Sequence, residues 1–263
     1  MQYPFEITKK GANIPLEIPA EIQAKLLDSF DPEASRFVWD GKRFFWNDLE
    51  AGHLDIDFFS KKMRYRMQHI NKAQEPLLRA LGWKSTEQKH VFDMTAGLGR
   101  DACLLFFAGF NVTMFERNPV LQILLKNALS EIPANEFTQC FKLAPQDSIS
   151  YLTNIVEKNL ASNAQNDQAD KIPFADAIYI DPMYPERKKS ALVKKELRII
   201  RNLVGADFDS EQLLEMAIKS GVARVVVKRP KGSEYVADLA PSHSVESPNT
   251  RFDVYLKSGN SGI

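Results

Sequence analysis

The chain has 263 residues, of which 44% are apolar, and its 34 Lys and Arg residues balance 34 Asp and Glu residues. This length and apolar content suit one large folded domain with a smaller appendage, and they exclude a disordered chain. The zero net charge excludes a polycation, so any affinity for nucleic acid has to come from a local basic surface.

The sequence indicates neither a membrane nor a metal site. The longest apolar run, "ACLLFFAGF" at 102–110, is much shorter than the roughly 20 residues that cross a bilayer. The first residues, "MQYPFEITKK", lack the apolar core of a secretory signal. Cys103 and Cys140 lie in apolar runs, without the spacing of metal ligands or of a disulfide framework. We therefore expect a soluble cytoplasmic protein with no membrane partner and no bound metal.

Residues 1–67 predict a small β-rich domain. Asp40 and Gly41 lie between two aromatic runs in "RFVWDGKRFFW", a pattern typical of a hairpin with a two-residue type I′ turn. The segment "HLDIDFF" alternates apolar and polar residues and predicts a further strand. We interpret the aromatic side chains as core packing in this small unit rather than as a surface that stacks on bases.

Residues 68–263 alternate between predicted strands and helices, which favours an α/β fold, a Rossmann-like domain built on a parallel sheet. Gly82 is expected to end a helix over "EPLLRAL", and Asn118 is expected to cap a helix that begins at Pro119. The polar segment 158–171 is interpreted as the end of a helix that runs into a mobile loop. The expected strands contain "HVFDM", "NVTMFE", "FTQCFKL", "ADAIYI", "ARVVVK" and "RFDVYL".

The loop after "HVFDM" is the first candidate binding site, because ligands of open parallel sheets lie beyond the carboxyl ends of the strands, where the strand order reverses. Gly97 and Gly99 let a cofactor approach the backbone there, and Glu116, after the second strand, can accept both hydroxyl groups of a ribose. Together with Ala102, the two glycines also match the nicotinamide fingerprint G-x-G-x-x-A, which leaves a nicotinamide cofactor as an alternative.

Asp93, just before this glycine loop, favours S-adenosyl-L-methionine as the cofactor. A carboxylate at this turn repels a pyrophosphate, whereas it attracts the ammonium and sulfonium groups of the methyl donor. Asp147 and Ser148 follow the third strand, where they can hold the adenine amino group. The structural alternative for these acids is helix capping, by Asp93 and Asp101 in the first loop and by Asp147 in the second.

Asp181, Pro182 and Tyr184 follow the fourth strand in "YIDPMYPERKK", and in a doubly wound sheet this strand lies next to the first. An exocyclic amino group is a poor nucleophile, because its lone pair is delocalised into the base. The Asp181 carboxylate and the Pro182 carbonyl can each accept one N–H and so align that lone pair, while Tyr184 stacks on the extruded base. These residues predict methylation of an amino group on a nucleobase, with a strand-ending turn as the structural alternative.

A dense basic segment follows and predicts a surface that binds RNA phosphates. Lys228 and Arg229, at the end of a later strand, are expected at the same edge of the sheet. A solvated helix face is the alternative for such a segment. The cations assigned to RNA binding within it are Arg187, Lys188, Lys189, Lys194, Lys195 and Arg198.

The motifs "DMTAGLGRDA", "FERNPV", "DPMYPERKKSALVKKELR", "LVG", "VVVKRP" and "RFDVY" resemble, in this order, the bacterial ribosomal RNA small subunit methyltransferase J family over residues 64–257. The resemblance implies a seven-stranded Rossmann-like methyltransferase fold that uses S-adenosyl-L-methionine. It also implies methylation of the exocyclic N2 of a guanine in small-subunit (16S) ribosomal RNA, either naked or in the assembled subunit. The family positions that bind the donor fall on Arg100, Asp101, Glu116, Arg117, Asp147, Ser148 and Asp181.

One of these positions departs from the family, which has a serine where this chain has Asp147. Two rival classes stay open at this point. One is a nicotinamide-dependent oxidoreductase with the same glycine loop, and the other is a non-catalytic RNA-binding or ribosome-assembly protein. The sequence leaves the oligomeric state open, a monomer included.

Overall fold

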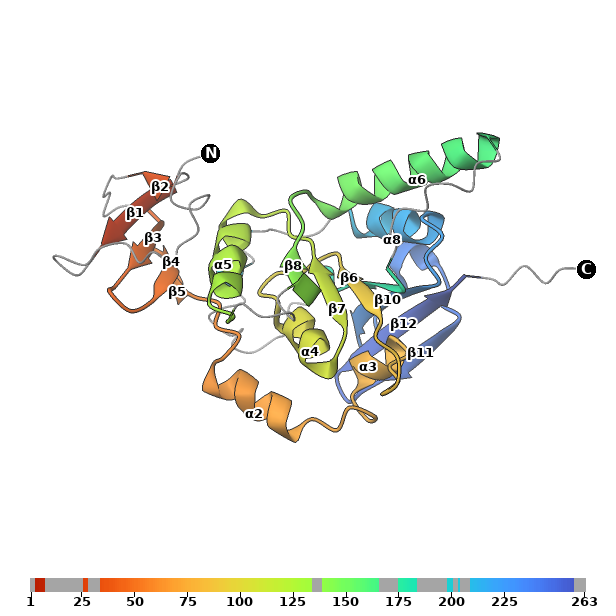
Figure 1. Ribbon diagram of the computed structural model, residues 1–263, viewed down its shortest axis with the longest axis horizontal. Coiled ribbons are helices and arrows are strands. Elements are labelled where there is room, and N and C mark those ends of the chain that lie inside the picture. Colours follow the sequence, from red (N-terminus) through yellow and green to blue (C-terminus); the bar gives the residue numbers. More distant parts are fainter. Residues whose placement is uncertain are drawn as a thin grey trace, which may run out of the picture.

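The structure is a computed structural model that describes residues 3–7, 26–27, 34–133, 139–165, 175–183, 198–200, 203 and 209–257. Its strands form two sheets, one of five strands near the amino terminus and one of seven strands in the rest of the chain (Figure 1). Within the described ranges, no helix combines the length and the apolar character needed to cross a membrane.

The amino-terminal sheet has the strand order β2-β1-β3-β4-β5. β1 pairs in parallel with β2 and β3, while β3, β4 and β5 form an antiparallel meander. The aromatic rings of Phe37, Phe44 and Trp46 are buried against one another, which confirms the packing interpretation for them. The strands are β1 (Tyr3–Ile7), β2 (Leu26–Leu27), β3 (Arg36–Trp39), β4 (Phe44–Asp48) and β5 (Gly52–Leu54).

The hairpin between β3 and β4 is confirmed, but its predicted turn type is wrong. The N–H of Asp40 donates to the carbonyl of Arg43 (3.3 Å), so Gly41 and Lys42 are the two central residues. Gly41 has a φ of 85°, whereas Lys42 is not among the residues with positive φ, and a type I′ turn requires positive φ at both. Asp40 Oδ1 instead accepts the N–H groups of Lys42 and Arg43 (2.9 and 2.7 Å) and holds the turn as an Asx turn.

The second sheet has the order β11-β12-β10-β9-β6-β7-β8. β8, β7, β6, β9 and β10 are parallel, and β12 and β11 close one side in antiparallel pairing. All six expected strands are present, and the seventh, β11, escaped the sequence pattern because only Val245 in it is buried. The strands are β6 (His90–Asp93), β7 (Asn111–Met114), β8 (Phe141–Leu143), β9 (Ala177–Ile180), β10 (Arg224–Pro230), β11 (His243–Glu246) and β12 (Thr250–Leu256).

Helices cover both faces of this sheet (Figure 1). Successive residues of a strand point to opposite faces, so Val91 of β6 packs in a cluster with α3, α4 and α5, while Phe92 packs in another with α6 and α8. The first cluster continues into the amino-terminal sheet. The helices are α2 (Lys61–His69), α3 (Pro76–Ala80), α4 (Arg100–Ala108), α5 (Pro119–Ser130), α6 (Ser148–Gln165), α8 (Ser210–Lys219) and the short 3₁₀ helix η2 (Val236–Asp238).

The predicted helix ends are largely confirmed. Asn118 Oδ1 accepts the N–H groups of Val120 and Leu121 at the start of α5 (3.0 and 3.1 Å), and Pro119 is the first helical residue. Gly82 follows the C-cap of α3 with a φ of 68°. α6 extends to Gln165, and positions 166–171 of the predicted loop lie outside the described residues.

The strand order decides where a ligand can bind. From β6 the chain moves to β7 on one side of the sheet, whereas β9 pairs with β6 on the other side, as expected for a doubly wound sheet. The strand order therefore reverses between β6 and β9, and a crevice opens there at the carboxyl ends of the strands.

Gly99, the N-cap of α4, lies where side chains pack closely beside this crevice. Its φ is 65°, and a Cβ added there would lie 2.9 Å from Leu125 and 3.0 Å from Phe58. Gly232 has a similar φ of 75° with nothing within 4 Å. Gly232→Ala should cost about 1–2 kcal/mol from backbone strain. Gly99→Ala should cost about 1–3 kcal/mol more from overpacking. Urea unfolding of both variants measures the two losses of unfolding free energy. Equal losses would contradict the tight packing around Gly99.

Candidate active site

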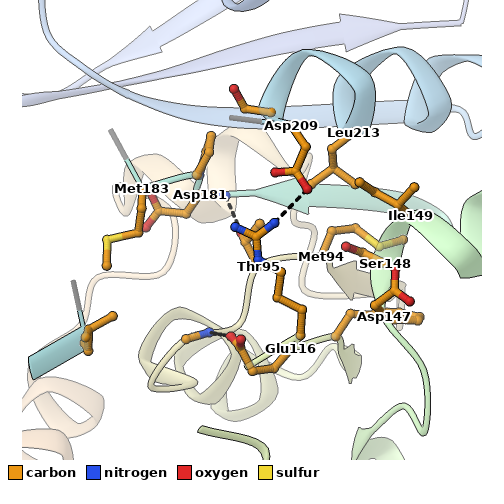
Figure 2. A pocket seen from close by; sticks show the side chains of 16 residues that line it. Met94, Thr95, Glu116, Asp147, Ser148, Ile149, Asp181, Met183, Asp209 and Leu213 are labelled. Carbon is orange, nitrogen blue, oxygen red and sulfur yellow. Dashed lines mark hydrogen bonds and ion pairs between the residues drawn. The ribbon is translucent and has the colours of Figure 1, made fainter. Parts of the chain in front are cut away.

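Two adjoining cavities lie at the carboxyl ends of β6, β7 and β9. Figure 2 shows the first, which runs from the end of β9 past the loop after β6 toward the start of α6. Its walls combine carboxylates with apolar side chains. They consist of Met94, Thr95, Gly97, Phe115, Glu116, Arg117, Asp147, Ser148, Ile149, Asp181, Pro182, Met183, Ile200, Asp209, Ser210 and Leu213.

Glu116 follows β7 and is only 7% exposed. One carboxylate oxygen accepts the N–H of Gly97 (2.8 Å), and the other accepts the N–H of Asn118 (2.7 Å). These two bonds tie the glycine loop to the start of α5 and fix the carboxylate in the wall of the first cavity. A carboxylate has about four acceptor positions, so a ligand hydroxyl can be accepted beside the backbone donors.

Asp147 and Ser148 line the same cavity, at the start of α6. Asp147 Oδ1 accepts the N–H of Ser150 (2.9 Å). Burial alone would raise the pKa of Asp147, but hydrogen bonds from Ser150 and from neighbouring backbone N–H groups together hold this pKa below its ordinary value. Asp147 therefore caps α6 and also lines the cavity, two roles that the sequence analysis had treated as alternatives.

Arg117 lies beside Glu116 and pairs with Asp209 at the start of α8, with 2.7 Å between the guanidinium and the carboxylate. Both side chains line the first cavity and are partly exposed. The pair joins the residues after β7 to the start of α8.

The second cavity shares a wall with the first, formed by Thr95, Gly97, Asp181, Met183 and Ile200. Its remaining lining is rich in charge. It consists of Arg66, Asp93, Ala96, Leu98, Arg100, Asp101, Tyr179 and Lys228.

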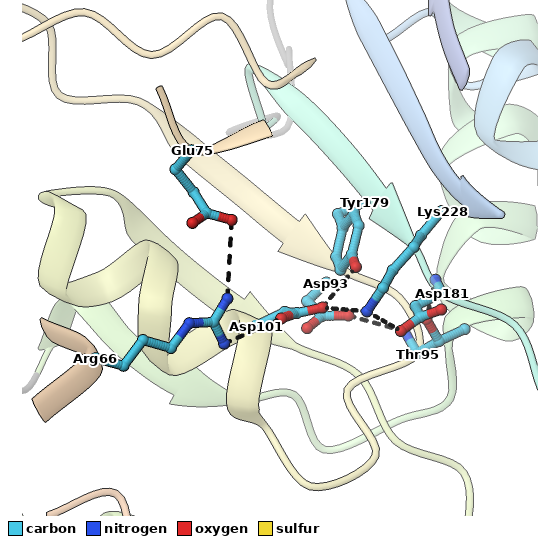
Figure 3. Close-up of polar contacts among 8 residues, drawn as sticks. All are labelled: Arg66, Glu75, Asp93, Thr95, Asp101, Tyr179, Asp181 and Lys228. Carbon is cyan, nitrogen blue, oxygen red and sulfur yellow. Dashed lines mark hydrogen bonds and ion pairs between the residues drawn. The ribbon is translucent and has the colours of Figure 1, made fainter. Parts of the chain in front are cut away.

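A lysine and two carboxylates form the centre of the second cavity (Figure 3). Lys228 Nζ lies 2.8 Å from Asp101 Oδ2 and 2.8 Å from Asp181 Oδ2. The hydroxyl of Tyr179 donates to the same Asp101 oxygen (2.8 Å). Arg66 approaches Asp101 from α2, with 3.9 Å between the guanidinium and the carboxylate.

Burial and charge oppose each other in this cluster. Burial alone would raise the pKa of Asp101 and lower that of Lys228. The attraction between the ammonium and the two carboxylates prevails, so the pKa of Asp101 is below and that of Lys228 above its ordinary value. Burial also raises the pKa of Tyr179 well above its ordinary value, and the charge of Asp101 adds to this, so the phenol remains a hydrogen-bond donor.

Asp93 differs from its neighbours because no cation lies against it in the described structure. It is 2% exposed and accepts one N–H, from Thr95 (3.2 Å). Burial raises the pKa of Asp93 well above its ordinary value, and the charges of Asp101, Asp181 and Glu116 raise it further. A cation bound in the second cavity would oppose this shift.

The two glycines of the loop differ in position. Gly97 lines both cavities, and beside its missing Cβ only the carbonyl of Thr95 approaches, at 3.9 Å. Gly99 is where the sequence interpretation needs correction. The space of its missing Cβ is filled by Leu125 and Phe58, so it is a glycine for packing and helix capping rather than for ligand approach.

Most cations that were predicted to bind RNA lie outside the described residues: Arg187, Lys188, Lys189, Lys194 and Lys195. Tyr184, from the predicted catalytic turn, also lies outside them. Arg198 is exposed. Arg229 donates to Ser233 Oγ and to the carbonyl of Glu234, so it holds the loop after β10. Lys228 lies against two carboxylates inside the second cavity, an arrangement that the sequence interpretation did not foresee.

Sequence reasoning also missed four residues of the site: Arg66, Thr95, Tyr179 and Asp209. Thr95 Oγ1 accepts the N–H of Asp181 (2.6 Å) and so joins the loop after β6 to the turn after β9. Tyr179 gave the clearest signal, because it is the only side chain with a polar group in the buried strand "AIYI".

Comparison with known proteins extends the description. A model of a family of putative SAM-dependent methyltransferases matches residues 45–257. The ribosomal RNA small subunit methyltransferase J of Thioalkalivibrio sulfidiphilus is 41% identical over 208 residues, 78% of this chain and 76% of that protein. Its namesake from Mannheimia succiniciproducens is 40% identical over 212 residues, 80% and 79% of the two chains. The crystal structure of a SAM-dependent methyltransferase from Neisseria gonorrhoeae gives a TM-score of 0.69 at 27% identity, covering 97% of this chain and 96% of that one.

The sheet topology, the cleft and the family model define the class of this protein, an enzyme that is a methyltransferase dependent on S-adenosyl-L-methionine. The chain belongs to the ribosomal RNA small subunit methyltransferase J family. The predicted fold class and cofactor are thereby confirmed, and the nicotinamide-dependent and non-catalytic alternatives fall away.

The charge cluster predicts how stability depends on Lys228. Lys228→Met should lower the free energy of unfolding at pH 7 by about 1.5–3 kcal/mol, since hydrogen bonds to charged groups are lost. With the lysine present, the lowered pKa of Asp101 contributes stability above about pH 4, and this is lost as the pH falls further. Without the lysine, burial should raise the pKa of Asp101 instead. Protonation of Asp101 should then stabilise the variant, so its loss of unfolding free energy relative to the wild type should shrink between pH 7 and pH 5.

Urea unfolding at both pH values measures this effect. The control is Lys231→Met, which removes an exposed, solvent-screened pair with Glu246 and should change the free energy of unfolding much less. A deficit for Lys228→Met that is as small as the control's, or that grows as the pH falls, would refute the charge-balance account.

Proposed function

We propose that this enzyme transfers a methyl group from S-adenosyl-L-methionine to the exocyclic N2 of a guanine in small-subunit ribosomal RNA. The observation that carries the proposal is that the two cavities meet at Asp181, which lines both. A group transfer between two bound molecules needs such a shared wall, where the reacting atoms can be held in contact. Because bacterial ribosomal RNA is made in the cytoplasm, we expect the enzyme to act there.

The first cavity fits the methyl donor. Phe115, Ile149 and Leu213 offer apolar surface to an adenine, and the fixed carboxylate of Glu116 is an acceptor for ribose hydroxyls. Gly97 leaves open space beside the backbone for the amino-acid portion. The donor, when bound, supplies a methyl group made electrophilic by the adjacent sulfonium.

The acids of the second cavity favour this donor over a dinucleotide. Asp93, Asp101 and Asp181 all line it. Lys228 balances Asp101 and Asp181, so Asp93 is the acid that would repel a pyrophosphate and attract the ammonium of the methyl donor. We assign this attraction chiefly to Asp93, whose carboxyl group has no cation against it in the described structure.

The second cavity suits the base. Guanine presents adjacent N1–H and N2–H donors, and carboxylates are acceptors, so Asp101 and Asp181 favour guanine over adenine, which presents an acceptor at N1. The relatives' name supplies the small-subunit RNA, and the family resemblance supplies N2.

Asp181 is assigned the central role in the reaction. Its carboxylate and the carbonyl of Pro182 accept the two N–H groups of the amino group and direct its lone pair toward the first cavity. The N–H of Asp181 is fixed on Thr95, and its carboxylate on Lys228, so the acceptor is held in place before the base arrives. The nitrogen becomes acidic once it carries the methyl group, so proton loss needs no strong base. Tyr184 is assigned the stacking contact with the base.

Glu116→Gln should weaken binding of S-adenosyl-L-methionine about 10- to 150-fold, because a charge-assisted bond to the ribose is worth about 1.5–3 kcal/mol. Calorimetric titration measures the affinity, and thermal unfolding checks the glycine loop that Glu116 also holds. Glu131→Gln, the same change just beyond the carboxyl end of α5, is the control. Unchanged affinity in a folded Glu116→Gln protein would remove Glu116 from the donor site.

Asp181→Asn should slow the methyl-transfer step on the order of 100-fold, as does the loss of one preorganised polar group elsewhere. Asparagine keeps the shape but can present N–H donors to the amino group, which disturbs its alignment. Single-turnover transfer of a labelled methyl group to unmodified small-subunit RNA measures the rate, with donor affinity titrated alongside.

Asp238→Asn, the same change at an exposed residue of η2 outside both cavities, is the control for that experiment and should leave the transfer rate unchanged. A normal transfer rate in Asp181→Asn would overturn the mechanism. Nucleoside analysis of the product identifies the base, and a methyl group found on an adenine or a cytosine would overturn the assignment to guanine.

A further inference from the structure

α2 is an unusually basic helix beside the second cavity. Its nine residues, "KKMRYRMQH", include no acid, and the acid-free stretch continues to Gln74. Its cationic side chains are exposed: Lys61, Lys62, Arg64 and Arg66, with His69 in the last turn.

The helix divides into two faces. Met63 is buried and Met67 is packed against the core. On the opposite face, Lys61, Lys62, Tyr65 and His69 lie together, because residues three and four apart are neighbours on a helix. We call these four residues the α2 face. In the described part of the chain, no carboxylate pairs with Lys61 or Lys62.

Tyr65 makes the α2 face more than a charged surface. It is 65% exposed, and its ring stacks on that of His69, with 4.0 Å between centroids and 25° between planes. His69 Nδ1 is 2.9 Å from the carbonyl of Tyr65, which holds the imidazole in this position. The result is an exposed, oriented aromatic platform flanked by two lysines.

The α2 face leads to the reaction centre. Lys62, Tyr65, Arg66 and His69 line a surface hollow, and among the described residues that line it Glu75 is the only acid. The guanidinium of Arg66 lies 3.8 Å from that acid and 3.9 Å from Asp101. Arg66 therefore lines both this hollow and the second cavity, and Figure 3 shows it pointing from α2 toward the cluster of Asp101 and Lys228.

A purely structural role explains this arrangement poorly. A solvated helix face needs no exposed aromatic ring and is stabilised by acids among its cations, yet this helix has none. Clustered cations that track a phosphate backbone, with an aromatic side chain on which a base stacks, are the usual components of sites for single-stranded nucleic acid.

We propose that the α2 face binds the single-stranded RNA next to the target guanine. Lys61 and Lys62 contact its phosphates, and Tyr65 stacks on a neighbouring unpaired base. Arg66 lies between this surface and the second cavity. This inference rests on the proposed function and adds residues of α2 to those that the sequence predicted to bind RNA.

The phosphate contacts are tested with Lys61→Gln/Lys62→Gln and unmodified small-subunit RNA at a series of salt concentrations. The slope of log affinity against log salt should fall by about 0.7 for each lost contact, or about 1.4 for both. The control, Lys158→Gln/Lys219→Gln, removes two lysines from α6 and α8 on the opposite face of the sheet and should leave the slope unchanged. Equal slopes for the two double variants would overturn the phosphate contacts.

The stacking contact is tested with Tyr65→Leu and Tyr65→Phe. Leucine should weaken RNA binding roughly 5- to 150-fold, whereas phenylalanine keeps the ring and should bind like the wild type. Equal affinities for the two variants would overturn the stacking role. Binding of S-adenosyl-L-methionine and thermal unfolding should be normal in both, because the side chain is exposed.

The wild-type protein separates this inference from the proposed function. If it fails to methylate small-subunit RNA, the proposed function is wrong, whatever the variants do. If it methylates that RNA and the α2 variants bind with wild-type affinity and slope, only the role of α2 is wrong.

Discussion

The crowding of negative charge at the carboxyl ends of the parallel strands is the constraint on which this site depends. Asp93, Asp101, Glu116 and Asp181 converge there, and their surroundings differ in three ways. Glu116 is held by backbone N–H groups, Asp101 and Asp181 share the ammonium of Lys228, and Asp93 is left with a raised pKa. The site is therefore suited to a cationic ligand, because a positive charge beside Asp93 would favour the ionised form of its carboxyl group.

Hydrogen bonds to the loop after β6 also fix the two cavities relative to each other. Thr95 bonds to the N–H of Asp181 and Gly97 bonds to Glu116, so one loop after β6 positions a carboxylate on either side of it. Lys228 extends this frame to β10, and Tyr179 extends it through β9 to α4. Precise alignment of two reactants is the main contribution of a methyltransferase whose donor already carries a reactive methyl group.

The amino-terminal part of the chain is tied to this frame by packing. The core of its sheet is continuous with the cluster beneath α4 and α5, and Phe58 fills the space beside Gly99 at the start of α4. α2 follows directly and carries Arg66 to the edge of the second cavity. A helix with four exposed lysine and arginine side chains thus adjoins the second cavity.

The sequence by itself determined six of the seven strands of the second sheet and the positions of the acids at strand ends, because strand periodicity, helix caps and glycine loops are local features. Asp93, Glu116, Asp147 and Asp181 could be placed in this way, and the neighbouring position of β9 and β6 followed from the general rule for doubly wound sheets. Only the tertiary structure decided the partners of Lys228, which lie 127 and 47 residues away along the chain, and the hydrogen bond from Tyr179 to Asp101. It also decided that Gly99 serves packing and that Gly41 and Lys42 form the hairpin turn. The physical reason is that a charge or a glycine in a sequence shows what a residue can do, whereas the atoms it meets depend on which distant strands and helices the fold brings beside it.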